Sequence, residues 1–409
     1  MDALLVVGKA ICLPFAGEEE YEQCMKDPKA FRQFVTNMYG RYPEIFPREM
    51  AQGFSLHSFT PISRKQEGFR MRRIELSSGE VYQVRPSFMM PYLVAKTEEV
   101  EKALFLRRWG VPFGALTYVF GRNDMFWYRA YLSLGRNSIV GATVKKSTSL
   151  PEHLLADEKH TRFNGEKIYA PTTVAQECIL GVGLADNAGM EALTKSYAHF
   201  KEEALNLNPD YRPKTVNTDG WEHTQKAWKA LFPGITVILC FLHAFLSIRD
   251  RCKRDKQLLR AIADKVWNIY HADTMAQFSQ RVRRLRQWAV KTITVDSVRD
   301  KVLGLCNKAP QFKKAFRHPQ AYRTSNMLDR QMNYQDRILY SIQYFHGYRA
   351  SALLYLRSMV LLWNFHPYAT GSRHDGLRAS PFEELNGFQY HSNWLQNMLV
   401  AASLRGWRT

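Results

Sequence analysis

Three aspartates in this sequence stand where carboxylates could meet. Asp157 ends the apolar run LLAD, Asp219 ends VNTD, and Asp329 lies near the start of an expected helix. Carboxylates that converge from separate elements are the ligands with which proteins hold one or two divalent cations. A lone aspartate at a strand end more often forms a turn or caps a helix. Metal chemistry therefore depends on whether the fold brings the three together.

The elements that must position these aspartates alternate between strands and helices. Tight turns are expected at Asn164-Gly165 and at 175–177, and strands joined so closely predict an antiparallel meander. The expected elements are strands 153–158, 167–173 and 178–185, helix 191–204, a strand ending at Asp219, helix 224–231 and strand 235–242. From this order we infer the α/β ribonuclease H-like fold, with a mixed five-stranded sheet.

The charge balance points to a polyanionic partner. The 409 residues carry a formal net charge of +19 at pH 7, and nucleic acid is the leading candidate for so basic a chain. The six cysteines are far apart, which favours a reducing compartment over a disulfide framework. We expect no signal peptide, and the longest apolar run, 235–242, is too short to cross a bilayer.

Residues 1–148 are expected to form a mainly helical DNA-binding region. Its first 60 residues read as short helices and loops, and residues 68–87 as a β-hairpin whose arginines contact phosphate or are simply solvated. Three short helices between Thr97 and Leu134 fit either a helix-turn-helix presenting Arg122 and Arg129 to DNA or an ordinary packing unit. The stretch 143–149 has the composition of a linker and places a boundary near 148.

Two further parts surround the last aspartate. Residues 249–320 lack strand patterns and carry 18 Lys and Arg against 6 Asp, so we expect a basic helical insertion over 249–322. The first part of the core is then 149–248, and 323–409 forms its last part with the C-terminal helices. A dense basic run in the insertion is expected to face DNA phosphates; its residues are Arg281, Arg283, Arg284 and Arg286.

A Cys-x-x-His pair follows the strand after Asp219. A single cysteine and a single histidine, Cys240 and His243, cannot complete a four-ligand zinc site, so packing is the favoured role for Cys240. His243 is expected at a helix start near the crevice, where it would contact DNA rather than a metal.

Taken together, these stretches resemble the bacterial insertion-sequence transposases with a DDE-type ribonuclease H-like domain, in the group related to Mutator elements. The resemblance covers about 150–365 and rests on LLADEKH, VNTDGW, CFLH and RTSNMLD in this order. It implies that Asp157, Asp219 and Asp329 hold two Mg²⁺ ions, which Mn²⁺ could replace. It also implies DNA as partner, at least a dimer on DNA, and a cytoplasmic, nucleoid-associated protein in bacteria.

The third acidic position departs from the family, in which it is usually glutamate. Asp329 fits the pattern best, while Asp336 on the same helix and Glu383 or Glu384 further along are the alternatives. The expected activity is metal-dependent cleavage at element ends and strand transfer into target DNA. The alternatives are a catalytically inactive, transposase-derived DNA-binding protein and a nuclease or resolvase of the same fold.

Overall fold

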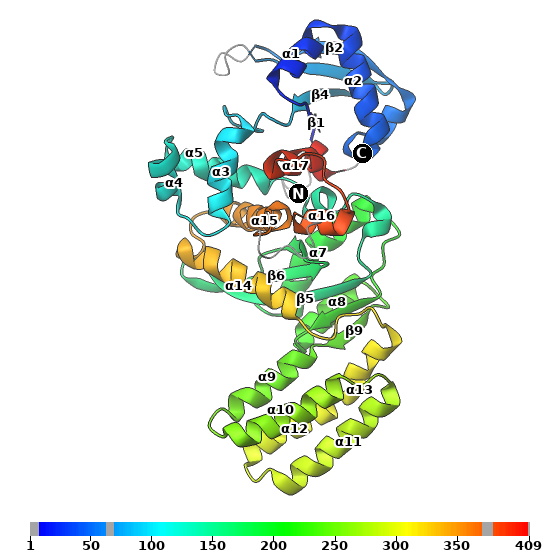
Figure 1. Cartoon of the computed structure of the whole chain (residues 1–409), viewed down its shortest axis with the longest axis vertical. Coiled ribbons are helices and arrows are strands. Elements are labelled where there is room, and N and C mark those ends of the chain that lie inside the picture. The colour runs from blue at the N-terminus through cyan, green and yellow to red at the C-terminus, as the bar shows by residue number, and fades with distance from the viewer. Residues whose placement is uncertain (1–7, 63–68, 370–378, 408–409) are drawn as a thin grey trace.

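The computed structural model describes residues 8–62, 69–369 and 379–407. The molecule is elongated, with a four-stranded sheet at one end, a bundle of helices at the other and a five-stranded sheet between them (Figure 1).

The five-stranded sheet contains a strand at each of the five predicted places along the chain, but the third ends at Val182 and the last at Leu239, since a helix begins at Phe241. Its strands lie side by side as β7-β6-β5-β8-β9, antiparallel from β5 to β7 and parallel from β5 to β9. The first strand is longer than expected, because it pairs with β6 as far as the hairpin turn at Asn164 and Gly165, both with positive φ. The strands are β5 (His153–Phe163), β6 (Glu166–Ala175), β7 (Cys178–Val182), β8 (Thr215–Thr218) and β9 (Thr236–Leu239).

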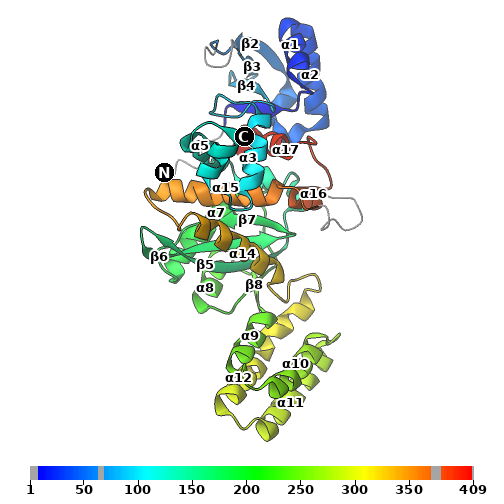
Figure 2. The ribbon, with the colours of Figure 1, turned by 60° about the vertical axis from the view of Figure 1, so that its left-hand side comes forward.

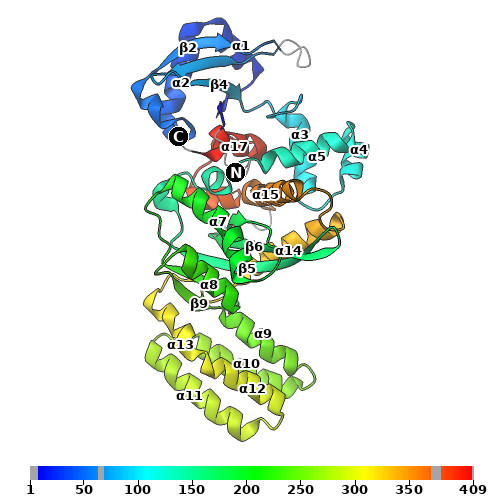
Figure 3. The same cartoon turned by 180° about the vertical axis from the view of Figure 1, so that it is seen from behind.

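Helices cover both faces of this sheet, and the alternation of side chains along β5 separates the two cores. Leu154 and Ala156 join the core beneath α7 and α8, whereas Leu155 joins the core that includes α14 and α15. Figure 3 shows α7 and α8 in front of the sheet, and Figure 2 shows α14 on the other side. The helices are α7 (Met190–Leu207), α8 (Glu222–Leu231), α14 (Asn326–Ser341) and α15 (Arg349–Phe365).

The N-terminal region contains a sheet that the sequence only partly predicted. The hairpin of β3 (Arg72–Leu76) and β4 (Val81–Pro86) is confirmed, although the expected start at Gly68 lies outside the described residues. The expectation of only helices and loops before residue 60 is wrong. The strands β1 (Ala10–Leu13) and β2 (Phe54–Phe59) complete the sheet in the order β1-β4-β3-β2. Its helices are α1 (Glu18–Lys26), α2 (Pro28–Arg41), η1 (Pro43–Ile45) and η2 (Arg48–Gln52).

The three expected helices between Thr97 and Leu134 are present. The last of them, α5, buries Trp127 and Tyr131 and packs against α15, so only part of its surface faces solvent. The helices are α3 (Thr97–Arg107), α4 (Phe113–Phe120) and α5 (Asp124–Leu134), followed by α6 (Ile139–Thr143) and η4 (Ser147–Ser149).

Residues 143–145, at the start of the expected linker, lie in the interior. Thr143 is fully buried, and the Lys145 ammonium donates to the carbonyls of Gly141 at 2.8 Å and Ala401 at 2.7 Å. A linker was therefore the wrong interpretation of residues 143–145, because their polar groups find partners in the C-terminal helices, whereas residues 146–148 are exposed. Those helices are α16 (Pro381–Asn386), α17 (Trp394–Ala401) and η7 (Ser403–Gly406). Most of the loop expected at 368–379 lies outside the described residues.

The basic stretch after β9 is helical, as predicted, and forms a core of its own. We call α9 to η5 the helical block. None of the helices within the described residues combines the length and the apolar character that a bilayer crossing requires. The block contains α9 (Phe241–Arg251), α10 (Lys256–Tyr270), α11 (Met275–Thr292), α12 (Asp296–Asn307), α13 (Ala309–Phe312) and η5 (Lys313–Arg317).

Candidate metal site

Two of the three predicted aspartates meet in space, together with a histidine. One ligand atom from each of Asp157, His243 and Asp329 lies within 4.8 Å of the other two. The three come from β5, the first turn of α9 and the first turn of α14, which are far apart in the sequence. We call these residues the aspartate–histidine cluster. All three are partly buried, so each side chain keeps some contact with solvent.

Asp157 reaches the cluster because successive side chains of β5 point to opposite faces of the sheet. Asp157 continues the row of Leu155, on the face covered by α14, whereas Glu158 continues the row of Ala156, on the face of α7 and α8. The Glu158 backbone N–H donates to Asp157 Oδ1 at 2.8 Å and so fixes the carboxylate.

Ser325 joins the cluster to the Cys-x-x-His pair. Its hydroxyl contacts both oxygens of Asp329, at 3.3 and 3.2 Å, and lies 3.5 Å from His243 Nδ1. The buried Cys240 Sγ donates to the same hydroxyl at 3.3 Å. Ser325 precedes α14 as predicted, but its side chain makes no capping hydrogen bond there. The hydroxyl instead holds Asp329 and the start of α9 in register.

Asp219 lies at the mouth of the site but outside the cluster. It is exposed at the end of β8, where Gly220 adopts a φ of 104° and the Trp221 N–H donates to Asp219 Oδ1 at 2.8 Å. This Asx-type turn directs the chain away from the sheet. Trp221 is 50% exposed, so its ring faces solvent beside the aspartate and is not part of the core.

Burial and like charge set the electrostatics of the site. Burial, and then the neighbouring Asp219 carboxylate, raise the pKa of Asp157 to about 6. The hydrogen bond to Cys240, with help from the Asp157 and Asp329 charges, raises the pKa of His243 to about 9. The pKa of Cys240 is lowered, because interactions with His243 outweigh the opposing effect of burial. Without a bound cation, His243 is therefore protonated at pH 7 and neutralises part of the carboxylate charge.

Glu158 is a second partly buried carboxylate, and it was not predicted from the sequence. The hydroxyls of Tyr197 and Thr224 each donate to Glu158 Oε1 at 2.8 Å, yet burial raises its pKa to about 7. It therefore anchors α7 and α8 to the strand that carries Asp157. The signal that could have revealed it is the pair of consecutive acids at the end of an apolar run.

The alternative third acids lie elsewhere. Asp336 Oδ2 accepts a hydrogen bond from Lys159 Nζ at 2.5 Å, so it is paired two turns along α14. Glu383 Oε2 accepts from the Ala379 N–H at 2.7 Å at the start of α16, and Glu384 belongs to the same short helix. Neither helix position belongs to the aspartate–histidine cluster. Among these candidates, Asp329 is the one that the structure brings to Asp157.

The predicted DNA-contacting arginines differ in their freedom. Arg122 forms an ion pair with Glu99 at 3.1 Å, whereas Arg129 is exposed on α5. In the helical block, Arg281 donates to the Asn268 carbonyl and Arg286 to Asn307 Oδ1. The two remaining predicted contacts, Arg283 and Arg284, are exposed on α11.

The residues present fit a divalent cation. Two converging carboxylates, a third carboxylate nearby and an imidazole form a donor set that suits Mg²⁺ through its oxygens and Mn²⁺ through both donor types. A ring nitrogen of His243 could join this set only after losing its proton. Comparison of the sequence with models of known protein families gives no match, and comparison with curated proteins gives no significant match.

Proposed function

We propose that this chain is a DNA transposase with a ribonuclease H-like catalytic domain, into which the helical block is inserted. The observation that carries the proposal is the meeting of Asp157 and Asp329 on one face of a sheet whose strands run β7-β6-β5-β8-β9. Asp219, at the carboxyl end of the neighbouring strand β8, completes three acids at one edge. The net charge of +19 supports a nucleic-acid partner.

Each group would have a defined role. Asp157, Asp219 and Asp329 would hold Mg²⁺, which supplies Lewis-acid activation of water or of a strand's 3′-hydroxyl when bound. Asp157 is kept in place by the Glu158 N–H, and Asp329 by the Ser325 hydroxyl. The protonated His243 would donate to a phosphate oxygen entering the site, and Trp221 offers an exposed ring for an unpaired base.

A cleavage and strand-transfer assay tests the proposal. The substrate is a plasmid that carries the chain's own gene with its natural flanking DNA, so that any element ends are present. We expect Mg²⁺-dependent cleavage and joining by the wild-type chain. Replacing Asp157 or Asp329 by Asn should lower the rate roughly a thousandfold, or about 4 kcal/mol, with DNA binding retained.

Asp336→Asn is the matched control, because it makes the same change on α14 while leaving the cluster intact. Asp219→Asn tests whether the exposed aspartate takes part. Full activity of Asp329→Asn would remove that residue from the site. Retained DNA binding without cleavage by the wild-type chain would instead favour an inactive DNA-binding protein, and cleavage without joining would favour a nuclease.

A further inference from the structure

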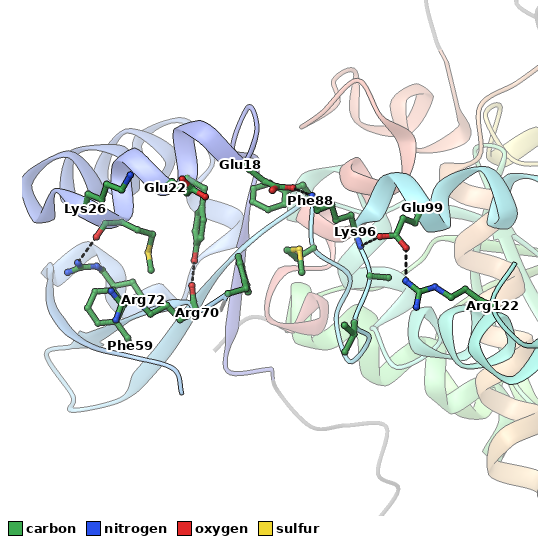
Figure 4. Close-up of a pocket in the computed structure, with 16 residues that line it drawn as sticks. Glu18, Glu22, Lys26, Phe59, Arg70, Arg72, Phe88, Lys96, Glu99 and Arg122 are labelled. Atoms are coloured by element: carbon green, nitrogen blue, oxygen red, sulfur yellow. Dashed lines mark hydrogen bonds and ion pairs between the residues drawn. The ribbon is translucent and has the colours of Figure 1, made fainter. Parts of the chain in front are cut away.

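A second site is present in the N-terminal region. A cavity of about 870 Å³ lies between α1, the edge of the four-stranded sheet and the start of α3 (Figure 4). It is at the end of the molecule opposite the helical block (Figure 1), and its lining includes no residue of the aspartate–histidine cluster. Its function is therefore separate from metal binding.

Two guanidinium groups line this cavity without a carboxylate partner in the described part of the chain. Arg70 and Arg72 lie over the ring of Phe59, at 4.1 and 4.4 Å from its centroid, and no ion pair to either is found among the described residues. Arg72 is only 8% exposed; its Nη2 donates to the Met25 carbonyl at 3.3 Å, while its buried Nε finds no hydrogen-bond partner among the residues that the structure describes. Burying a charged donor without a partner is costly, so this group is suited to an anionic ligand.

The acidic residues of the cavity do not neutralise this pair. Glu18 is bound to Lys96 at 2.5 Å, and Glu99 to Arg122 at 3.1 Å, which leaves Glu22 exposed on α1. Figure 4 shows Lys96, Glu99 and Arg122 on the side of the cavity away from Arg70 and Arg72. Counted over the described residues, the lining has five basic and three acidic side chains. The positive charge is thus concentrated at the two arginines.

The cavity also has an aromatic wall next to the arginines. Tyr21 stacks on Phe69 with 5.5 Å between ring centroids and meets the edge of Phe88 at 5.8 Å. Tyr21 also donates to the Arg70 carbonyl at 2.9 Å, which connects the wall to the backbone just before β3. Phe69 is the partly exposed member of the three. A planar ring could stack there while an attached anion reaches the guanidinium groups.

We propose that this cavity binds one unpaired nucleotide of a DNA strand, with its phosphate at Arg70 and Arg72 and its base against Phe69. The inference rests on the proposed function for the identity of the partner as DNA. It adds a site for single-stranded DNA, which strand cleavage and joining expose. An acidic peptide would satisfy the arginines but would leave the aromatic wall without a planar partner.

Binding of a labelled ten-nucleotide oligothymidylate to the full-length chain tests this site. We expect Arg70→Gln to weaken binding roughly tenfold. The slope of the logarithm of the binding constant against the logarithm of the salt concentration should also become shallower by about 0.7. Arg70 is exposed, so the fold should survive the change. Arg73→Gln is the matched control, because it removes the same charge three residues along the chain, in β3 and outside the cavity. Phe69→Leu should also weaken binding by roughly tenfold.

Several outcomes would overturn the proposal. If Arg70→Gln and Arg73→Gln weakened oligonucleotide binding equally, the loss would come from the change in net charge and not from a contact in the cavity. Competition by thymidine monophosphate as strong as that by the oligonucleotide would mean a site for free nucleotides, and strong competition by polyglutamate a site for acidic peptides. Plasmid cleavage distinguishes the two proposals: if cleavage is present while Arg70→Gln behaves as Arg73→Gln, only this inference fails. If cleavage is absent while Arg70→Gln weakens oligothymidylate binding more than Arg73→Gln does, only the proposed function fails.

Discussion

The helical block and the N-terminal region are joined to the five-stranded sheet in different ways. The block buries its own core, with Ile262, Phe278 and Val302 fully inaccessible. The N-terminal region shares one core with α15 and α17, and the Cys12 N–H donates to Ser403 Oγ at 3.1 Å across almost the whole chain. The block is therefore a unit attached at one end, whereas the N-terminal region and the five-stranded sheet belong together. We call the part of the molecule outside the block the body.

The metal site lies at that attachment. The Cys240 N–H donates to the Thr218 carbonyl at 2.7 Å, and the Phe241 N–H to the Arg323 carbonyl at 3.0 Å, where the chain enters and leaves the block. His243 belongs to the first helix of the block, while Asp157 belongs to the sheet. An element that is separate in its core thus still contributes a residue to the site.

The largest stability effect is expected in the shared body. Arg357 on α15 and Glu203 on α7 form an ion pair at 2.6 Å with side chains 3% and 4% exposed. Arg357→Met would leave Glu203 buried without its partner and should cost about 3–5 kcal/mol. Chemical denaturation measures this loss. The ion pair of the exposed Arg330 with the half-buried Glu177 gives the control, since Arg330→Met should cost less than about 1 kcal/mol. Similar losses of unfolding free energy in the two variants would contradict the expectation that the buried ion pair matters more than the other one.

A cavity in the block should destabilise the block alone. Ile262→Ala on α10 removes buried methyl groups and should cost about 3 kcal/mol. Hydrogen exchange should accelerate in α10, α11 and α12, while exchange in β5 and β6 stays unchanged. Equal acceleration in the sheet would show that the block and the body unfold together, and that the separate core does not make a separate unit.

The parts of the fold that local patterns encode were predictable. The hairpin between β5 and β6 follows from Asn164-Gly165, and the helices of the block from apolar spacing. The strand β1 was not predicted, because its four residues pair with β4 some seventy positions away and are buried against η7. The buried Lys145 was missed for the same reason, since its partner Ala401 is distant in sequence.

The candidate site shows the same limit. The apolar run before Asp157 and the helix start before Asp329 indicated carboxylates that could converge, and these two do. The position of His243 depends on how α9 packs against the start of α14, which no local pattern records. Asp219 was predicted to hold the metal ions together with the other two aspartates. It is exposed because Gly220 turns the chain away directly after β8.

Cation binding should stabilise the junction of block and body in a pH-dependent way. The pKa of Asp157 is raised from 3.8 to about 6, so the folded chain keeps a proton there that the unfolded chain loses. The contribution of this group to the free energy of unfolding therefore falls as pH rises from 3.8 to about 6. Mg²⁺ at about 100 times its Kd should restore about 2.7 kcal/mol near pH 8.

Near pH 5 the gain should be smaller, because protons on Asp157 and His243 compete with the cation. Thermal unfolding with and without Mg²⁺ measures both gains. Asp157→Asn should abolish the gain, and Asp336→Asn should keep it. A gain of equal size at both pH values would mean that the cation binds somewhere other than the cluster.

The smallest effect on stability is expected for Arg283 and Arg284. Their replacement also tests whether the block contacts DNA. Both are exposed on α11, so changing both to Gln should alter the free energy of unfolding by less than about 0.5 kcal/mol. If each contacts a phosphate, the slope of duplex binding against salt should fall by about 0.9 for each. Fluorescence anisotropy at several salt concentrations measures the slope.

The matched control removes two exposed lysines from the body. Lys226 and Lys229 lie on α8, and their replacement by Gln makes the same change in net charge. A loss of slope confined to the Arg283 and Arg284 variant would make α11 a duplex contact and the block more than a structural insertion. Equal losses in both variants would mean that the change in net charge alone accounts for the effect and that α11 makes no specific phosphate contact.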